Sequence, residues 1–477
     1  MFQEAIAKFK DATGRTGPAT WKLGNYPNGE ADLPVRGISW YEAAAYAAFA
    51  GKELPTLYHW YFADNYGDRY TMPGVLLPAG NFESAAIRSA ADTKTVSAFG
   101  AVNMAGNVRE WVANPTDRGQ RLAVGGSLVD TAYQYGEGFP RTGFDRAPDI
   151  GARYMKQTTL PVAAATAPLF AALAEKPRID PNKIKPVSEA EYAIYTRFFE
   201  QRPAPLDVKV EPDQESSPHW TRTKVSYATG YGGERMNAFL YLPKNAAPPY
   251  QTIVYMPGSN AFFNFRPYAN VADAPGWSFT DQLVRGGRAV LVPIWKGSFE
   301  RSFESAPGLP AVRDLYVQHV SDLRQSMAFL ATRPEVDQDR IGYHGVSYGA
   351  SRGVVLLALE PRLKVGILVV GGLSLIRGNG DLLPPEISNA TYAPRVQAAV
   401  LMINGRNDAI NPYESSQVPL FKLFGSPPAR KKHKSYPGGH FVFGWYDEMA
   451  RDTHDWLDEH FGLVRPAASV NQPKTAK

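Results

Sequence analysis

The stretch Ile341-Gly342-Tyr343-His344-Gly345-Val346-Ser347-Tyr348-Gly349-Ala350 decides the fold of the longer half of this chain. It begins as a short apolar run, typical of a buried strand, and passes through Gly-x-Ser-x-Gly into a helical pattern. A serine on such a turn must adopt strained backbone angles. Gly345 and Gly349 let the strand and the helix approach closely enough to hold it there. The stretch therefore predicts a nucleophile elbow with Ser347 as the nucleophile.

A single Gly-x-Ser-x-Gly is common in loops, so its surroundings decide the interpretation. Apolar runs typical of strands recur at residues 252–256, 289–295, 340–345, 365–370 and 398–403. Helical patterns lie between them, the clearest with one apolar face formed by Tyr316, Val320, Leu323, Met327 and Leu330. Alternating strands and helices imply a parallel sheet covered on both faces. Just before this series, residues 224–228 and 236–242 are predicted to pair around a glycine-rich turn.

The order of the polar residues supports the elbow. Asp408 lies in a loop directly after the strand at 398–403, and His440 lies in a glycine-rich loop before the last helix, predicted at 445–461. Nucleophile, acid and histidine follow one another in this order in the α/β-hydrolase fold. A neutral hydroxyl is a poor nucleophile, so His440 would take the proton of Ser347 while Asp408 orients the imidazole. We predict that these three residues form a catalytic triad.

The tetrahedral intermediate of such a reaction needs N–H donors for its oxyanion. We predict one donor at Tyr348, directly after the nucleophile, and one at Ser259 in the loop after the strand at 252–256, with Asn260 as a weaker candidate. Aromatic residues follow that loop and end the next strand, and we predict that they contact substrate: Phe262, Phe263, Phe265 and Trp295. Such rings would favour aromatic acyl groups, for example feruloyl or benzoyl esters. The alternative is that they pack in the core.

The first half has a different character, rich in glycine and tryptophan with few periodic elements. Five of its motifs are similar to the formylglycine-generating-enzyme or sulfatase-modifying-factor family: residues 34–43, 50–56, 99–111, 124–127 and 150–154. The resemblance implies a mixed α+β fold of the C-type-lectin-like kind. Within it, Ser39 and Glu42 predict a capping box that opens a helix, and Gly51 is placed to end that helix.

The resemblance also implies limits on chemistry. Oxidase members of the family use paired cysteines to bind copper, and this chain contains no cysteine. We therefore expect no oxidase activity. Some members bind calcium near a Gly-Asn-x-x-Glu segment, so Asn107 and Glu110 are candidate ligands for a structural calcium ion. The alternative at this position is a capped turn followed by a surface glutamate.

The second half resembles α/β-hydrolases of the dienelactone-hydrolase and prolyl-oligopeptidase-like type. The whole chain is similar to the C-terminal region of bacterial serine/threonine-kinase fusion proteins, through these segments among others: residues 15–21, 41–51, 217–220, 232–235, 295–301 and 345–349. No kinase motif occurs in the sequence, so no kinase domain is expected. The first domain starts late, as if its initial strands were missing.

Length and composition favour two domains and a connector. We predict a formylglycine-generating-enzyme-like domain at 1–156, a linker with one docking helix at 157–215, an α/β-hydrolase domain at 216–465 and a flexible tail at 466–477. In the linker, a capping box from Ser188 to Glu191 opens the helix, with Tyr192, Tyr195, Phe198 and Phe199 as its apolar stripe. The net charge of +5 is scattered apart from Arg430-Lys431-Lys432, which we interpret as a solvated loop.

These patterns favour a serine hydrolase that cleaves carboxylic esters through an acyl-enzyme. A peptidase of the prolyl-oligopeptidase-like type, and a sensory or binding module that uses the lectin-like half, are the alternatives. We expect a small-molecule or polymer-linked ester as substrate, no required cofactor, no nucleic-acid partner and no membrane span in this chain. No secretory signal is recognisable at the N-terminus, so a cytoplasmic location is the default expectation.

Overall fold

The structure is a computed structural model. It describes residues 7–64, 79–136, 138–157, 167–173, 180, 184–200, 204–262, 277–302, 309–373, 383–408, 410–440 and 442–467. The chain divides into two compact units. The first comprises Met1–Arg178 with the loops Gly405–Tyr413 and Pro437–Val442, and the second comprises Ile179–Asn404, Glu414–Tyr436 and Phe443–Lys477.

The first unit is built around a small mixed sheet of four strands in the order β3-β2-β1-β4. The strands are β1 (Arg109–Pro115), β2 (Arg121–Val124), β3 (Phe139–Arg141) and β4 (Ile150–Ala152). β1 runs parallel to β4 and antiparallel to β2. The helices are α2 (Trp40–Phe49) and α3 (Leu57–Asp64), with 3-10 turns at Ala132–Gly136 and Ala167–Phe170. The predicted mixed α+β character of this half is confirmed.

Local signals for α2 are also confirmed. The Ser39 hydroxyl accepts from the N–H of Glu42 while the Glu42 carboxylate accepts from the N–H of Ser39, so two free N–H groups at the helix start are satisfied. Gly51 follows the helix with φ 62°, a conformation that glycine adopts without a steric penalty. The helix thus begins and ends where the sequence predicts.

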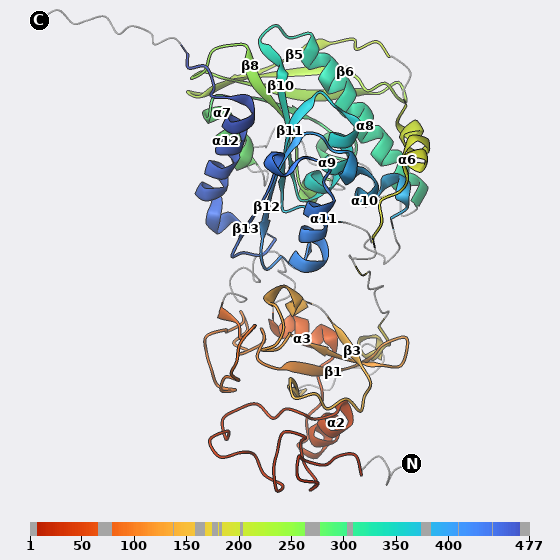
Figure 1. Ribbon diagram of the computed structural model, residues 1–477, viewed down its shortest axis with the longest axis vertical. Coiled ribbons are helices and arrows are strands. Elements are labelled where there is room, and N and C mark those ends of the chain that lie inside the picture. Colours follow the sequence, from red (N-terminus) through yellow and green to blue (C-terminus); the bar gives the residue numbers. More distant parts are fainter. Residues whose placement is uncertain are drawn as a thin grey trace, which may run out of the picture. The chain divides into compact units, whose positions relative to one another are not determined.

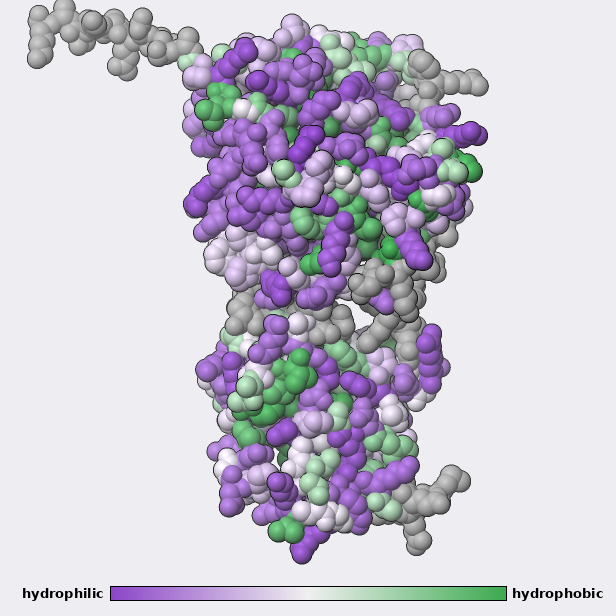
Figure 2. All heavy atoms as spheres, viewed as in Figure 1, coloured by the Kyte–Doolittle hydropathy of each residue, from purple (hydrophilic) through white to green (hydrophobic). Residues whose placement is uncertain are grey.

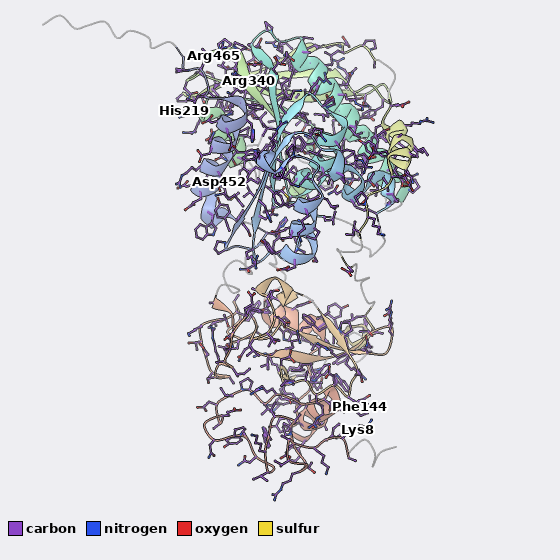
Figure 3. All side chains as sticks on the ribbon, viewed as in Figure 1. Lys8, Phe144, His219, Arg340, Asp452 and Arg465 are labelled. Atoms are coloured by element: carbon purple, nitrogen blue, oxygen red, sulfur yellow. The ribbon has the colours of Figure 1, made fainter. Side chains whose placement is uncertain are left out.

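Arginine side chains replace regular hydrogen bonding in the irregular parts of this unit. Arg146 donates to the carbonyls of Lys8, Lys10 and Gly17 and to the carboxylate of Glu42. Nearby, the Lys8 ammonium lies 5.1 Å from the ring centre of Phe144 (Figure 3). Arg109 is buried and binds both Asp130 and Asp149. Carbonyls without strand or helix partners are satisfied in this way, which keeps a unit with little regular structure ordered.

The second unit contains a nine-stranded sheet in the order β13-β12-β11-β10-β8-β9-β7-β6-β5. Neighbouring strands of this sheet are antiparallel from β5 (Lys209–Ser216) through β6 (Trp220–Ala228) and β7 (Arg235–Pro243) to β9 (Ala289–Pro293). From β9 the order continues in parallel through β8 (Tyr250–Met256), β10 (Val336–Val346), β11 (Leu363–Val369) and β12 (Ala399–Gly405). This is the predicted α/β-hydrolase fold, with β13 (Lys431–Tyr436) at one edge.

Helices cover both faces of this sheet (Figure 1). α7 (Trp277–Arg285) and α12 (Tyr446–Phe461) pack together on one face, and α8 (Leu309–Ala331) and α9 (Tyr348–Leu359) pack together on the other. Shorter elements follow β11 and β12: α10 (Asn389–Tyr392), α11 (Val418–Leu423) and turns at Pro385–Ile387 and Ala393–Arg395. The surface over α12 is hydrophilic in Figure 2, which agrees with the acidic outer face of that helix. Within the described part of the chain, no helix is both long and apolar enough to cross a bilayer.

Two edge strands correct the sequence interpretation. Residues 209–216, which we assigned mostly to the linker, form β5, and Lys431-Lys432, which we assigned to a solvated loop, begin β13. Both strands lack a clear apolar alternation because they are exposed edges, where charge and proline prevent unwanted pairing with other chains. Charge on an edge strand and charge in a loop look the same in the sequence.

The predicted docking helix forms as α6 (Glu189–Thr196), opened by its capping box at Ser188. It packs on the hydrolase unit. The ring centre of Tyr192 lies 5.7 Å from that of Tyr392, and the buried Phe199, just after the helix, lies 6.0 Å from the same ring. Arg395 adds an ion pair with Glu189. Tyr192 and Phe199 of the predicted stripe therefore pack within the second unit, whereas Phe198 is exposed.

Candidate active site

Ser347 stands between β10 and α9 in a left-handed backbone conformation, with φ 51° and ψ −104°. A non-glycine residue pays about 1–3 kcal/mol for such a conformation, so the surrounding structure must impose it. Its N–H donates to the carbonyl of Val369 at the end of β11, over 2.8 Å. The strand, strained turn and helix predicted from the sequence are confirmed.

The two glycines of the motif allow the close approach that this turn requires. A Cβ atom on Gly345 would lie 2.5 Å from backbone atoms of Gly349, and one on Gly349 would lie 2.3 Å from the carbonyl oxygen of Met256. Real Cβ atoms do not come so near to backbone. The helix start is therefore pressed against the end of β8, where the next candidate residues follow.

The segment after β8 lies beside the proposed nucleophile. A Cβ atom on Gly258 would lie 3.6 Å from the Cβ of Ser347. Gly258 is followed by a 3-10 turn at Ser259–Ala261, in which Ser259 and Asn260 are the first residues. The first N–H groups of a helical turn are not used within it. Tyr348 is the first residue of α9, directly after Ser347. Both predicted donors thus lie at the start of a helical turn.

Asp408 and His440 are in direct contact. His440 Nδ1 lies 2.8 Å from Asp408 Oδ2, and both side chains are buried. The other carboxylate oxygen of Asp408 accepts from the N–H groups of Ile410 at 2.8 Å and Asn411 at 3.0 Å. With Oδ1 occupied by two backbone donors, the carboxylate has a fixed orientation. A proton held on Nδ1 leaves Nε2 of His440 able to accept another.

The loops that carry this pair are held on both sides. The N–H of Asn407 donates to the carbonyl of Gly438 over 2.9 Å, which ties the two loops together. Before His440, the Tyr436 hydroxyl donates to Asp452 at 2.5 Å and the Lys434 ammonium lies 3.0 Å from the same carboxylate. Asp452 is on α12 (Figure 3). This anchor fixes the end of β13 from which the loop of His440 begins.

Each of the three predicted triad positions comes directly after a strand of the nine-stranded sheet. Ser347 follows β10, Asp408 follows β12, and His440 follows β13, while β10, β11 and β12 are parallel neighbours. Ligands of open α/β folds bind at the carboxyl ends of parallel strands, so these positions are those that the fold favours for a site. The Asp408 and His440 side chains are directly bonded to each other.

The aromatic residues predicted to contact substrate are placed differently. Trp295 is completely buried and donates its indole N–H to the carbonyl of Tyr255, and Phe262 is 1% exposed. Phe262 packs on Tyr348 with ring centres 4.5 Å apart. Both rings are therefore buried against protein groups, and Phe262 lies beside the residue that follows Ser347. Phe263 and Phe265 lie outside the described residues.

Two further histidines near the elbow are buried and neutral. Burial lowers the pKa of His344 to about 3 and that of His319 to about 4. His344 lies within β10 between the rings of Tyr255 and Phe279. Neither is placed as a general base, since an imidazole with so low a pKa takes up a proton poorly at neutral pH.

The candidate calcium ligands are engaged with protein groups. Asn107, with φ 67°, accepts from Arg88 N–H and Asn81 Nδ2, each at 2.9 Å. Both carboxylate oxygens of Glu110 accept from Arg153, and Trp60 Nε1 donates to one of them at 2.7 Å. Among the described residues, no group of three acidic or histidine side chains is arranged to hold a metal ion. The calcium site stays a prediction, and the bonds of Asn107 and Glu110 to protein groups do not support it.

Comparison with known proteins assigns the first half. Residues 2–158 match the family described as sulfatase-modifying factor enzyme 1-like domain, which confirms the resemblance in its motifs. The chain is 39% identical over 90 residues to serine/threonine-protein kinase pkn1 of Chlamydia pneumoniae, covering 17% of this chain and 14% of that protein. It is 32% identical over 121 residues to inactive C-alpha-formylglycine-generating enzyme 2 of Mus musculus, covering 21% and 39%. The chain thus spans less than half the length of these curated relatives.

Solved structures are similar over the second half. Acetyl xylan esterase 1 from Thermoanaerobacterium sp. has a TM-score of 0.44 at 19% identity and covers 57% of this chain and 95% of its own. A glucuronoyl esterase from Solibacter usitatus has a TM-score of 0.41 at 13% identity, covering 59% and 99%. A putative dienelactone hydrolase from Klebsiella pneumoniae has a TM-score of 0.38 at 19% identity, covering 51% and 99%.

Proposed function

We propose that this chain is a serine hydrolase that cleaves carboxylic esters, with Ser347 as nucleophile, His440 as general base and Asp408 as the acid that orients it. What supports the proposal is a strained serine on a strand–turn–helix, together with a bonded Asp408–His440 pair whose members follow β12 and β13 in the chain. Strain at a single non-glycine residue is typical of functional positions.

The reaction follows from the chemistry of these groups. The Ser347 hydroxyl attacks the ester carbonyl carbon while His440 Nε2 takes its proton, and Asp408 stabilises the imidazolium that forms. The N–H groups of Tyr348 and Ser259 would donate hydrogen bonds to the oxyanion. Collapse of the intermediate breaks the bond to the alkoxy group, which leaves as the alcohol with the proton from His440. Water, activated by the same imidazole, then hydrolyses the acyl-enzyme.

A more specific question is which acyl group of the ester substrate the site prefers. An aromatic preference, for feruloyl or benzoyl esters, has no support from Phe262 or Trp295, because both rings are buried behind the elbow. It depends on Phe263 and Phe265, which lie outside the described residues. Comparing kcat/KM for methyl ferulate, p-nitrophenyl benzoate and p-nitrophenyl acetate would decide it. Slower cleavage of both aromatic esters would exclude the preference.

The proposed function is tested by active-site labelling. Incubation with a fluorophosphonate probe should label the purified chain once, at Ser347, as read by peptide mapping, and should abolish hydrolysis of p-nitrophenyl acetate in parallel. Ser347→Ala should prevent labelling and lower kcat by a factor on the order of 10⁴ to 10⁶. Hydrolysis by Ser347→Ala at the wild-type rate, or a label on another residue, would exclude this assignment.

The lectin-like half is proposed as a non-catalytic companion. It contains no cysteine with which to bind copper as the oxidases of its family do. Its relatives are matched over only part of their length, so their activities are not transferred to it.

A further inference from the structure

A buried carboxylate organises the loop after β9. Asp322, on α8, is 0% exposed and accepts three hydrogen bonds: from the N–H of Lys296 at 2.8 Å, from Arg301 Nη1 at 2.9 Å and from the Tyr231 hydroxyl at 2.8 Å. Two of these donors belong to the loop 294–302 and the third to the turn between β6 and β7. One side chain therefore ties three parts of the fold together.

The donors are in turn linked to one another. Arg301 also donates to the carbonyl of Ile294 at 2.7 Å and to the Tyr231 hydroxyl at 2.6 Å, so it closes the loop 294–302 on itself. The Lys296 ammonium forms an ion pair with Glu234 at 2.7 Å. Residues 232–235 and 295–301 are two of the segments that carried the resemblance of this chain, and neither belongs to the proposed triad. They meet where Glu234 pairs with Lys296 and Arg301, and these two residues also donate to Asp322.

The loop is joined to the segment that carries the proposed oxyanion donor. Ser298 pairs with Phe262 in an antiparallel bridge, and the N–H of Phe262 donates to the carbonyl of Ser259 at 3.0 Å to close the 3-10 turn. The Phe262 ring packs on Tyr348 and on His319, whose Nε2 lies 2.9 Å from the carbonyl of Lys296. A path of direct contacts therefore leads from Asp322 through the loop to Ser259.

We propose that Asp322 is a positioning residue for the reaction, which holds the loop 294–302 and through it the Ser259 N–H at the place of the developing oxyanion. This inference rests on the proposed function. An oxyanion donor acts only within about 2.7–3.1 Å of the developing charge. A shift of half an ångström or more therefore weakens transition-state binding more than binding of the substrate ester.

The test separates positioning from stability. Asp322→Asn keeps the shape of the side chain but removes its charge and replaces one oxygen with an N–H₂ group. That group stands either where Oδ2 accepts from Lys296 and Arg301 or where Oδ1 accepts from Tyr231, so not all three hydrogen bonds can be kept. We expect kcat for p-nitrophenyl acetate to fall by a factor on the order of 10 to 10², with KM changed by less than about threefold. The affinity for a trifluoromethyl ketone, which resembles the tetrahedral intermediate, should fall by the same factor as kcat/KM.

Asp458→Asn is the matched control. Asp458 is on α12 and binds the buried Arg288, so the substitution breaks an ion pair of a buried arginine elsewhere in the same unit, although the Asp458 carboxylate itself is 35% exposed. It should lower the melting temperature while leaving kcat and ketone affinity as in the wild type. If Asp322→Asn is folded and loses no more kcat or ketone affinity than Asp458→Asn, the positioning role is wrong. A rise in KM alone would also overturn it, because that indicates a substrate contact.

A milder variant covers the case in which Asp322→Asn does not fold. Tyr231→Phe removes one donor to Asp322 and one of the two acceptors of Arg301 Nη2, and it should lower kcat severalfold with KM unchanged. Wild-type kcat in folded Tyr231→Phe would then reject the inference. The proposed function fails separately, if the wild type neither hydrolyses the ester nor takes the label at Ser347.

Discussion

The two oxygens of the Asp408 carboxylate have separate partners: Oδ2 lies 2.8 Å from Nδ1 of His440, and Oδ1 accepts from two backbone N–H groups. Asn at this position would place either its N–H₂ group or its single oxygen toward the imidazole, so it cannot serve both sets of donors. We expect Asp408→Asn to lower kcat by a factor on the order of 10³ to 10⁴. The carboxylate would no longer fix the imidazole in the tautomer with its proton on Nδ1, and the imidazolium would have no counter-charge. Steady-state hydrolysis of p-nitrophenyl acetate measures this. Asp32→Asn, an exposed change in the first unit, is the control, and equal kcat in both variants would refute the pairing.

The geometry of the elbow predicts that alanine substitutions at Gly349 and at Gly444 have very different effects on stability and turnover. A Cβ on Gly349 would meet the carbonyl oxygen of Met256 at 2.3 Å, whereas one on Gly444 would meet nothing within 4 Å. Gly349→Ala should therefore destabilise the chain by about 1–3 kcal/mol and displace Ser347. Gly444→Ala should change neither stability nor turnover. Thermal unfolding and ester hydrolysis of both variants test this, and a fully active Gly349→Ala would show that the elbow tolerates the added methyl group.

The buried His344 predicts a pH dependence of stability. Burial lowers the pKa of His344 to about 3, and the unfolded chain titrates near 6.5, so the unfolded state binds more protons between these values. The folded state is therefore not penalised for its neutral His344 above pH 6.5, and it loses stability as the pH falls below that value. Between pH 7 and pH 5 this loss amounts to about 2 kcal/mol of the unfolding free energy. His344→Leu should remove this difference.

Urea unfolding of wild type and His344→Leu at pH 7 and pH 5 measures the effect. The exposed His219 in the same unit supplies the control, His219→Leu, which should keep the wild-type difference between the two pH values. If His344→Leu loses as much stability at pH 5 as the wild type does, the imidazole is not the group that titrates.

A buried carboxyl group in the first unit, that of Asp64, predicts a pH dependence of stability in the opposite direction. Burial raises the pKa of Asp64 from 3.8 to about 8, with a further contribution from Glu110, and neither oxygen has a hydrogen-bond partner among the described residues. The folded state then binds the proton more tightly, so stability is lost as the pH rises from about 4 to 8. Between pH 5 and 7 the loss is on the order of 3 kcal/mol.

Asp64→Asn should stabilise the first unit at pH 7 and have little effect at pH 5. Hydrogen exchange in peptides covering α3 and β1 reports this unit separately from the other. Asp32→Asn is again the control, because its side chain is exposed. A stabilisation of equal size at both pH values would mean that Asp64 is already charged in the folded state.

The sequence predicts the elbow and the acid–histidine order because both depend on local signals: glycines at fixed positions, and polar loops at the ends of apolar strands. It could not predict the contacts of Asp322, whose partner Tyr231 is 91 positions away in the chain. Nor does the sequence distinguish an aromatic ring in the core from one lining a cleft, which is why Trp295 was assigned to the substrate site although it is buried. Edge strands β5 and β13 were missed for a related reason, since an exposed strand carries the charges of a loop.

The last prediction concerns where the chain can be trimmed before the hydrolase unit. A chain that begins at Ser217 lacks β5, which leaves β6 as an unpaired edge, and it lacks Phe199, which is buried against Tyr392. A chain that begins at Asp180 keeps both. We expect the shorter chain to have lower soluble yield and to aggregate, because an open sheet edge and an uncovered aromatic patch both promote association. Size-exclusion chromatography with light scattering compares the two, with the full chain as reference. Equal solubility and equal turnover per labelled serine would show that residues 180–216 contribute nothing to the hydrolase unit, although they form part of its sheet and of its helical layer.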